Sequence, residues 1–343
     1  MPSADVTTAF PLTRVNPVMP GAYGIAGRAT ETGLRHHSTG AVFYVDPNYV
    51  GVRDGLGVVV DRDGTDPNWP LATIGQALAK CQSYRGDTIY VMANGFWTDA
   101  PKGAANYPLP VTETVIVTVH GVRIVGVFPS GSLGVPWRGV AGGDTILTVS
   151  GIDVLVEGFC FMGTPADAGV NCNGIYAAWA GGAVGPWGDC LTVRHCFFDS
   201  DIQTAIQLEF SWNTDIHHNT FQGCDIVGIY SDGAPAISGC HFHDNWFWEV
   251  GWGEIGAISV VNATNCKIDH NQIFNSDAQQ GGAPLIATDE GIDTSGGRSN
   301  LVHDNVLSCL LPGPGNDYSD FCNSGTDAWC NNKCMNGVTT TNP

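Results

Sequence analysis

Two adjacent histidines stand in the segment TDIHHNTFQGC, which runs from Thr214 to Cys224. Imidazole and thiolate groups are common zinc ligands, and histidine is also the commonest general base. On a strand, however, His217 and His218 would point to opposite faces, whereas the ligands of a metal ion must converge on one point. The pair alone does not predict a metal site. Its role depends on where the two histidines fall in the repeating pattern of the chain.

A pair of carboxylates could catalyse glycoside hydrolysis, which uses two carboxyl groups about 5–10 Å apart. If the protein is an enzyme, Glu209 and Asp232, with Asp201 near them, are the candidate catalytic residues. Glu209 follows Ile206 and Leu208 with the alternation of a strand. With those two apolar side chains inward, Glu209 points outward.

A second group of carboxylates could bind Ca²⁺, which prefers oxygen ligands. The turn DRDGTDP places Asp61, Asp63 and Asp66 within a few residues of one another. The helix-loop calcium pattern is incomplete, because Gly64 stands at the wrong position and no glutamate closes the loop. We therefore expect a plain turn and no cofactor, with Ca²⁺ as the alternative.

Tryptophans are the candidate binding residues. The segment NWFWEVGWGE places Trp246, Trp248 and Trp252 near one turn. Exposed aromatic side chains stack on sugar rings or fill protein interfaces. They predict contact with a glycan or a partner protein, and internal packing is the alternative.

Cysteines are numerous, at twelve in 343 residues, but a chain of this length can build its own core, so disulfides are optional. The best disulfide candidates cluster towards the C-terminus: Cys309, Cys322, Cys330 and Cys334. Free thiols and metal ligands are the alternatives for this group. Cys240 and Cys266 are expected to be small buried thiols, with a disulfide between stacked coils as the alternative.

All these residues lie on a repeating pattern of short strands. The segments IHHN, FHDN, IDHN and VHDN, aligned with earlier ones, define an apolar column: Ile124, Val156, Val193, Ile216, Phe242, Ile268 and Val302. A second apolar column follows the asparagines: Phe161, Phe198, Phe221, Phe247, Ile273 and Leu307. One such repeat cannot bury its apolar face alone, but stacked repeats can. The pattern therefore predicts an all-β solenoid.

The asparagines form a column of their own: Asn219, Asn245, Asn271 and Asn305. The column just before it contains Gly158, His195, His218, Asp244, His270 and Asp304. Asparagine tolerates the left-handed backbone of a turn, and stacked amides can form a hydrogen-bonded ladder. We therefore interpret the asparagines as a structural ladder and His218 as part of a turn, rather than as a zinc site.

The composition limits the classes of function. Lys and Arg total 14 against 33 Asp and Glu, a net charge of −19, which disfavours nucleic-acid binding. No apolar run approaches the roughly 20 residues of a membrane span. The N-terminus lacks the layout of a signal peptide. With 43% hydrophobic residues, the chain can bury a large core.

The chain divides into three expected parts. Residues 1–40 show no period and predict an extended arm that docks for assembly. Residues 41–310 carry the strands, and within them the segment LATIGQALAKC predicts one short amphipathic helix. Residues 311–343 form a cysteine-rich cap or tail.

The segment AIQLEFSWNTDIHHNTF resembles the parallel β-helix repeat. Residues 63–91 resemble the entry to such rods, where a short helix caps the N-terminal end. The resemblance covers about residues 41–310 and implies a right-handed parallel β-helix of the pectate-lyase-like superfamily. This fold hosts lyases, hydrolases, epimerases, adhesins and phage tail or capsid-surface proteins, so it implies no single function.

Enzymes of this fold would need further signatures. A pectate-type lyase combines a calcium–carboxylate cluster with an arginine or lysine base, and a polygalacturonase-type hydrolase has Asp-Asp, Gly-His and Arg-x-Lys motifs. The sequence has neither an Asp-Asp pair nor an Arg-x-Lys motif. Between residues 151 and 343 its only arginines and lysines are Arg194, Lys267, Arg298 and Lys333.

We therefore predict a non-enzymatic structural or adhesive protein. It would be displayed on a virion, as a capsid decoration, head fibre or tail component, or on an extracellular surface. We expect a homo-oligomer, with a trimer as the favoured state. Residues 1–40 would join it to a larger assembly, and its surface would contact glycans. The alternative is a polysaccharide-degrading glycoside hydrolase or lyase.

Overall fold

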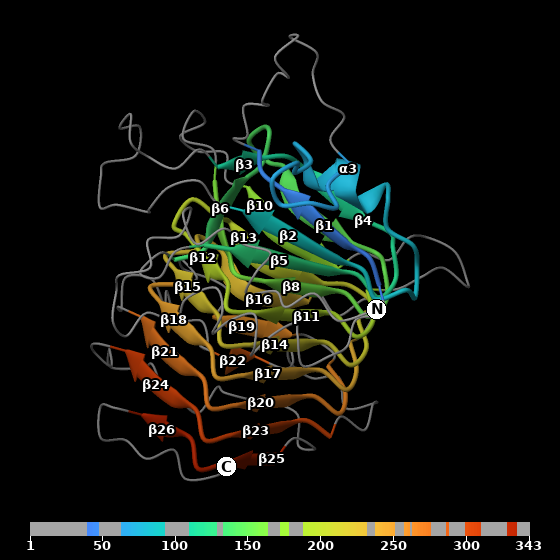
Figure 1. Cartoon of the computed structure of the whole chain (residues 1–343). Coiled ribbons are helices and arrows are strands. Elements are labelled where there is room, and N and C mark those ends of the chain that lie inside the picture. The colour runs from blue at the N-terminus through green and yellow to red at the C-terminus, as the bar shows by residue number, and fades with distance from the viewer. Residues whose placement is uncertain are drawn as a thin grey trace, which may run out of the picture.

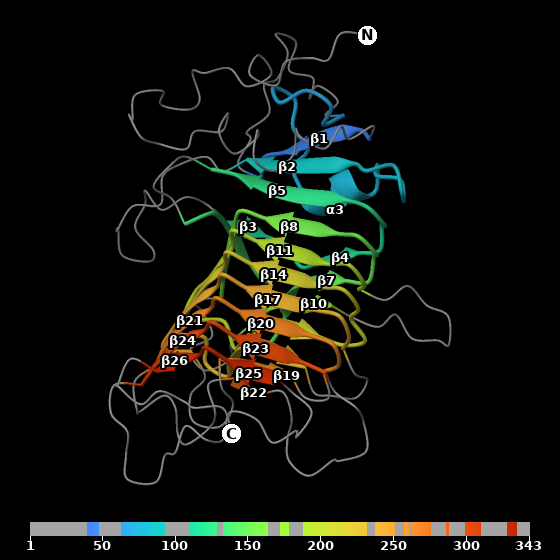
Figure 2. The ribbon, with the colours of Figure 1, turned by 90° about the horizontal axis from the view of Figure 1, so that it is seen from below.

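The chain winds into a stack of coils that adds strands to three sheets (Figure 1). The computed structural model describes these parts of the chain: residues 40–47, 63–92, 110–128, 133–163, 172–177, 188–231, 237–250, 257–260, 263–275, 286–287, 299–309 and 328–334. Strands from the N-terminal coils lie at one end of the stack and β25 and β26 at the other (Figure 2). None of the helices in these parts is long and apolar enough to cross a membrane.

All strand pairs within the three sheets are parallel. The ten-stranded sheet contains β1 (Val42–Val45), β2 (Thr88–Met92), β5 (Arg123–Val127), β8 (Leu155–Glu157), β11 (Thr192–Arg194), β14 (Asp215–His217), β17 (His241–His243), β20 (Lys267–Asp269), β23 (Leu301–His303) and β25 (Ala328–Cys330). The nine-stranded sheet contains β3 (Val111–Thr112), β6 (Val135–Arg138), β9 (Phe159–Met162), β12 (Phe197–Phe198), β15 (Thr220–Gln222), β18 (Trp246–Trp248), β21 (Gln272–Asn275), β24 (Val306–Cys309) and β26 (Lys333–Cys334). The seven-stranded sheet contains β4 (Val115–Val117), β7 (Thr145–Val149), β10 (Asn173–Ala177), β13 (Thr204–Leu208), β16 (Val227–Ser231), β19 (Ile258–Val260) and β22 (Ile286–Ala287).

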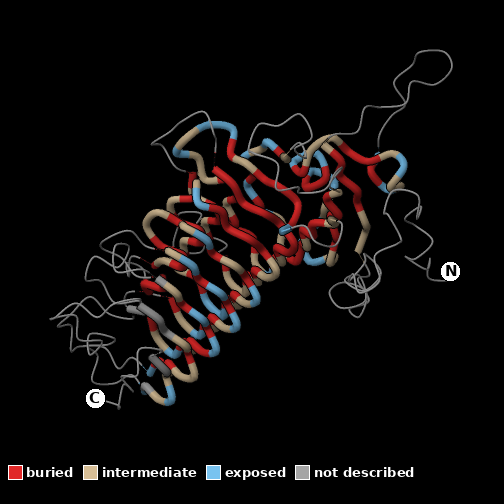
Figure 3. The backbone as a smooth tube through the Cα atoms, turned by 90° about the vertical axis from the view of Figure 1, so that its left-hand side faces the viewer, coloured by how far each residue is buried: buried red, intermediate tan, exposed pale blue. Residues whose placement is uncertain are grey.

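The two apolar columns that the sequence predicts lie in the interior of the stack, where they pack with apolar residues of the seven-stranded sheet such as Ile175 and Ile206. In the ten-stranded sheet, the column from Ile124 to Val302 runs through consecutive register partners, all fully buried. In the nine-stranded sheet the rings of the second column stack with centroids 5.0, 4.9 and 4.5 Å apart, in the order Phe161, Phe198, Phe221 and Phe247. Along the coils, buried stretches are interrupted by half-buried and exposed positions (Figure 3). The solenoid prediction is confirmed.

From β8 onward, a tight corner of one or two residues joins each strand of the ten-stranded sheet to the following strand of the nine-stranded sheet. The residue before each asparagine has a left-handed backbone, with φ of 55° at His218, 53° at Asp244 and 55° at both His270 and Asp304. This corrects the expectation that the asparagine itself takes this conformation. Histidine and aspartate tolerate positive φ better than most residues, which explains why they occupy the position.

The asparagine side chains run as a buried hydrogen-bonded chain behind these corners. Asn219 Nδ2 donates to Asn245 Oδ1 at 3.1 Å, and Asn245 Nδ2 donates to Asn271 Oδ1 at 3.0 Å. Asn271 donates to Asn305 at 3.0 Å, and Asn305 donates to Asn332 at 2.9 Å. Each amide also accepts a backbone N–H from the preceding coil, so the polar groups of the corner find partners away from water.

A short helix, α3 (Ile74–Leu78), contacts β1, β2 and β4 at the N-terminal end of the stack. Thr73 caps it by accepting a backbone N–H. The Glu113 carboxylate accepts the N–H groups of Ile74 and Gly75 at 2.9 and 2.8 Å. These bonds satisfy donors that a helix leaves unpaired at its start. The predicted short capping helix is confirmed.

The two predicted terminal parts fall mainly outside the described residues. Of the arm expected over residues 1–40, the structure describes Gly40 alone. Of the cap or tail expected over residues 311–343, it describes residues 328–334, which hold β25 and β26. These two strands extend the ten-stranded and nine-stranded sheets by one more coil.

Candidate functional site

Histidine and aspartate side chains gather on the outer surface of the ten-stranded sheet. Strands β14, β17 and β20 each turn one central residue into the core, so the residues on either side of it face outward. We call the outward residues of these strands the histidine–aspartate face: Asp215, His217, His241, His243, Lys267 and Asp269.

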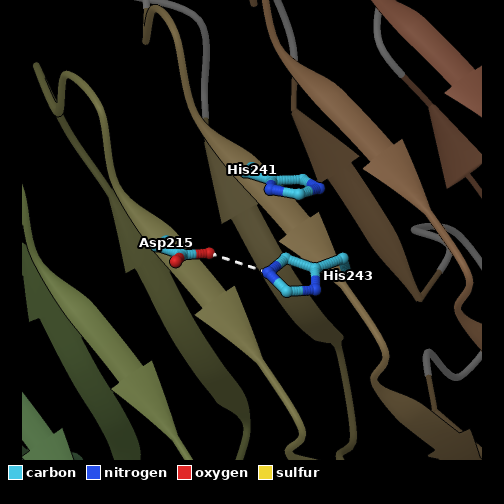
Figure 4. Close-up of side chains that lie close together, drawn as sticks. All are labelled: Asp215, His241 and His243. Carbon is cyan, nitrogen blue, oxygen red and sulfur yellow. Dashed lines mark hydrogen bonds and ion pairs between the residues drawn. The ribbon is translucent and has the colours of Figure 1, made fainter.

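Hydrogen bonds connect this face across three strands. Asp215 Oδ1 lies 3.1 Å from His243 Nε2, although the two residues are 28 positions apart (Figure 4). His241 Nε2 lies 2.5 Å from Asp269 Oδ1. The His243 ring stacks on His241 with centroids 3.9 Å apart and on His217 with centroids 4.8 Å apart.

Burial and hydrogen bonding move the pKa values of these histidines in different directions. Burial lowers the pKa of His217 to about 4. Burial also lowers the pKa of His241, and the hydrogen bond to Asp269 only partly opposes it. Burial would lower the pKa of His243 too, but hydrogen bonds to two carboxylates outweigh it and raise that pKa. His217 and His241 are therefore mainly neutral at neutral pH.

The aspartates of the face are held ionised. Burial would raise the pKa of Asp269, but hydrogen bonds from His241, His270 and Lys267 outweigh it and lower that pKa to about 2. Burial would likewise raise the pKa of Asp215, but the hydrogen bond with His243 and the neighbouring imidazoles lower it. The face thus combines imidazole groups with carboxylates, a donor set that suits a divalent metal ion.

The structure places the histidine pair from the opening segment at the edge of this face. His217 belongs to the face, and His218 is exposed at the corner, with the two Nδ1 atoms 2.8 Å apart. Sequence reasoning missed His241 and His243, although HFH on a strand puts both imidazoles on one face. It also missed the partner Asp215, although the column that aligns Ile216 with Phe242 places Asp215 beside His241.

The candidate catalytic carboxylates lie elsewhere in the coil. Glu209 follows β13 and accepts a hydrogen bond from the Tyr176 hydroxyl. Asp201 is half-buried in the turn between β12 and β13. Asp232 lies outside the described residues, so the expected pair with Glu209 stays a prediction.

The candidate calcium turn is held by its own side chains. Asp63 Oδ1 accepts the backbone N–H of Thr65 at 2.8 Å, and Asp66 Oδ1 accepts that of Asn68 at 2.7 Å. Hydrogen bonds from Thr65 lower the pKa of Asp63. Both carboxylates thus stabilise turns. Asp61 lies outside the described residues, and Ca²⁺ at this turn stays the alternative to a plain turn.

Aromatic side chains line the outer surface of the neighbouring nine-stranded sheet. Trp246 and Trp248 on β18 are 38% and 46% exposed, and their ring centroids lie 5.8 Å apart. Phe274 on β21 is half-buried, and its ring lies 6.5 Å from that of Trp248. We call Trp246, Trp248 and Phe274 the aromatic ridge. Trp252, the third predicted binding residue, lies outside the described residues.

Cysteines of the described residues carry free thiols. Cys240 and Cys266 are both buried and unbridged. A hydrogen bond to Cys266 and burial raise the pKa of Cys240, which keeps it protonated. In the predicted disulfide group, Cys330 is a free thiol, whereas the side chains of Cys309, Cys322 and Cys334 lie outside the described part.

Comparisons with known proteins agree with this architecture. Residues 168–338 match the model of a family described as right handed beta helix region. A search of curated proteins finds no match. Among solved structures, the chain is similar to DFA-IIIase from Arthrobacter chlorophenolicus A6 without its lid, with 16% identity, a TM-score of 0.46 and coverage of 85% of this chain and 71% of the other.

Two further similar structures come from viruses. The chain is similar to ORF18 of Geobacillus virus E2, with 12% identity, a TM-score of 0.35 and coverage of 85% of this chain and 60% of the other. It is also similar to the Dettilon tailspike protein, with 10% identity, a TM-score of 0.35 and coverage of 94% of this chain and 72% of the other. At these identities and TM-scores the likeness says nothing about function. By its parallel sheets, its repeating registers and its matching family model, the chain is a right-handed parallel β-helix protein.

Proposed function

We propose that this β-helix is a structural and adhesive rod that contacts neutral glycans through the aromatic ridge. The observation that carries the proposal is the exposure of Trp246 and Trp248 side by side on one strand. Exposed apolar groups gathered in one place mark interaction sites on proteins. The sheet fixes the backbone that carries both rings, so binding would require no ordering of the backbone.

The surroundings of the ridge suit a carbohydrate. Gln222 and Gln272 are exposed and are register partners of Trp248 and Trp246. Amide side chains can donate and accept hydrogen bonds, as sugar hydroxyls require. The net charge of −19 disfavours an acidic polysaccharide, which is why the proposal names neutral glycans.

Display on a virion or another extracellular surface, as a homotrimer, is part of the same proposal. Ile116 on β4 and Val140 after β6 are 64% and 63% exposed near the N-terminal coils. Apolar surface of this kind favours association between copies. The arm expected over residues 1–40 would then join the rod to a larger assembly.

Affinity measurements with neutral polysaccharides test the ridge. We expect Trp248→Ala to weaken binding by roughly five- to tenfold, because a stacked aromatic contact contributes about 1 kcal/mol or somewhat more. Trp212→Ala is the matched control, since Trp212 is 44% exposed but lies outside the ridge, in a bridge with Ser238. Equal binding by Trp248→Ala and wild type would rule out the ridge as the binding surface.

The same assays distinguish the polysaccharide-degrading alternative. Reducing ends and unsaturated products are followed during incubation with each polysaccharide. An adhesive rod releases neither. Product release that disappears in Glu209→Gln would overturn the adhesive function in favour of an enzyme.

A further inference from the structure

Three side chains of the histidine–aspartate face lie where the ligands of one metal ion would lie. We propose that Asp215, His241 and His243 bind one divalent transition-metal cation, for which Zn²⁺ is the probe. Among the described residues they form the one group of three metal-ligating side chains whose ligand atoms all fall within 4.8 Å of one another. The site is separate from the aromatic ridge and goes beyond the proposed function.

The parallel sheet explains why the three ligands converge. His241 and His243 stand two positions apart on β17 and point to the same face. Asp215 is the register partner of His241 on the adjacent strand β14, and its carboxylate reaches diagonally to His243 (Figure 4). A tetrahedral zinc site needs ligand atoms about 3.4 Å apart. Asp215 Oδ1 and His243 Nε2, at 3.1 Å, already meet that spacing.

Other carboxylates hold the two imidazoles in place. Asp244 Oδ2 lies 2.8 Å from His243 Nδ1, which leaves Nε2 on the side of Asp215. Asp269 Oδ1 lies 2.5 Å from His241 Nε2, which leaves Nδ1 for a metal. A carboxylate on the second ring nitrogen is the usual support of a metal-binding histidine, because it fixes the tautomer and the ring orientation.

The donor set and exposure indicate which ion would bind. Two imidazole nitrogens and one carboxylate oxygen suit Zn²⁺ and its transition-metal neighbours, whereas Ca²⁺ requires about six to eight oxygen ligands. The side chains of Asp215, His241 and His243 are 41%, 35% and 18% exposed, so an ion can reach them from solvent. Three protein ligands leave the fourth tetrahedral position for water or an added ligand.

Zinc titration of the full chain, purified without a histidine tag and stripped with a chelator, tests the site. Calorimetry should show saturable binding of one Zn²⁺ per chain. Asp215→Asn and His241→Ala should each weaken it by more than about tenfold. Co²⁺ bound by wild type should give the visible absorption of a tetrahedral ion without a thiolate charge-transfer band, which excludes the cysteines as ligands.

A matched control lies two coils further along the rod. His303 and Asp304 repeat the His243–Asp244 contact, with Nδ1 and Oδ2 2.6 Å apart. In that coil, Leu301 on β23 occupies the position that His241 has on β17. Its register partner on the preceding strand is Lys267, where His241 has Asp215. His303→Ala should therefore leave zinc affinity unchanged.

Three outcomes would overturn the proposal. They are no saturable zinc binding by wild type, unchanged affinity in Asp215→Asn and His241→Ala, or an equal loss in His303→Ala. Because these side chains face solvent, the variants should keep the wild-type circular dichroism spectrum. Asp215→Asn, which changes little besides the charge, remains informative if an alanine variant unfolds.

Discussion

At the scale of the residue, the corner asparagines show how a polar side chain can stabilise a buried position. Asn245 Oδ1 accepts both the backbone N–H of Asn219 at 3.0 Å and its side-chain amide at 3.1 Å. Its own amide donates to Ile216 O at 2.9 Å and to Asn271 Oδ1 at 3.0 Å. One side chain thus satisfies polar groups from coils on both sides.

Asn245→Ala should lower the free energy of unfolding by about 2–4 kcal/mol. The substitution removes the hydrogen bonds that Asn245 makes with the buried N–H groups of Asn219 and with the carbonyl of Ile216, and each such loss costs about 1–3 kcal/mol. Urea unfolding followed by circular dichroism measures the change. Gln222→Ala is the control, because that exposed side chain should contribute less than about 0.5 kcal/mol. Equal unfolding midpoints for the two variants would contradict the role of the ladder.

At the scale of the element, each strand is stabilised mainly by the strands above and below it. The rings of Phe198, Phe221 and Phe247 are stacked and nearly parallel, with interplanar angles of 4° and 5°. All three are fully buried. A strand of two or three residues would not persist alone, so its stability comes from this packing and from the ladder hydrogen bonds.

Phe221→Ala should destabilise the fold by about 3–5 kcal/mol, because it opens a cavity between two stacked rings. Phe221→Leu retains much of the volume and should cost roughly 1–2 kcal/mol. Urea or thermal unfolding of both variants measures the difference. If the two substitutions cost the same, cavity formation is not what stabilises this column.

The entry to the rod should be sensitive to acid through Asp87. Its buried carboxylate accepts the N–H groups of Ala41 at 2.7 Å and Gln82 at 2.8 Å and pairs with Arg85 at 2.5 Å. Burial alone would raise the pKa of Asp87, but these hydrogen bonds outweigh it and hold the pKa below its usual range.

A lowered folded-state pKa stabilises the fold above the unfolded-state pKa of about 3.9, and the contribution is lost as the pH falls below that value. Asp87→Asn should therefore be clearly less stable than wild type at neutral pH. The gap in urea midpoint between the two should shrink as the pH is lowered to about 3. A gap that stays constant with pH would show that the ionised carboxylate is not the stabilising group.

At the scale of the whole molecule, the rod is a one-dimensional stack in which each coil contacts its neighbours. Such a stack leaves the outer faces of its sheets free to carry function. The histidine–aspartate face and the aromatic ridge lie on adjoining sheets, and the short turn of Asp244 and Asn245 joins their strands β17 and β18.

Light scattering of the purified protein should give the mass of a trimer, three times the 36.2 kDa of one chain. Removing residues 1–40 should leave the circular dichroism of the coils intact but abolish incorporation into a larger assembly. A monomer, or unchanged incorporation of the shortened chain, would contradict the assembly part of the proposed function.

Much of the fold was predictable from the sequence, whereas little of the candidate site was. The column that contains Ile216, Phe242 and Ile268 could be identified in the sequence, because every coil must place an apolar residue at the same inward position. The left-handed corner was misplaced by one residue, since asparagine tolerates that conformation as well as the His218 and Asp244 positions do. In the candidate site, HFH and the alignment of Asp215 with His241 were signals, but the diagonal contact between Asp215 and His243 could not be predicted.

The sequence by itself determined the parallel β-helix, because burial requires the same residue types at the same position of every coil. Only the tertiary structure decided which outward side chains meet. Asp215 and His243 are 28 residues apart, and they touch because the turns between them bring β14 and β17 into register. Outward positions face water, so no repeating apolar requirement marks them in the sequence.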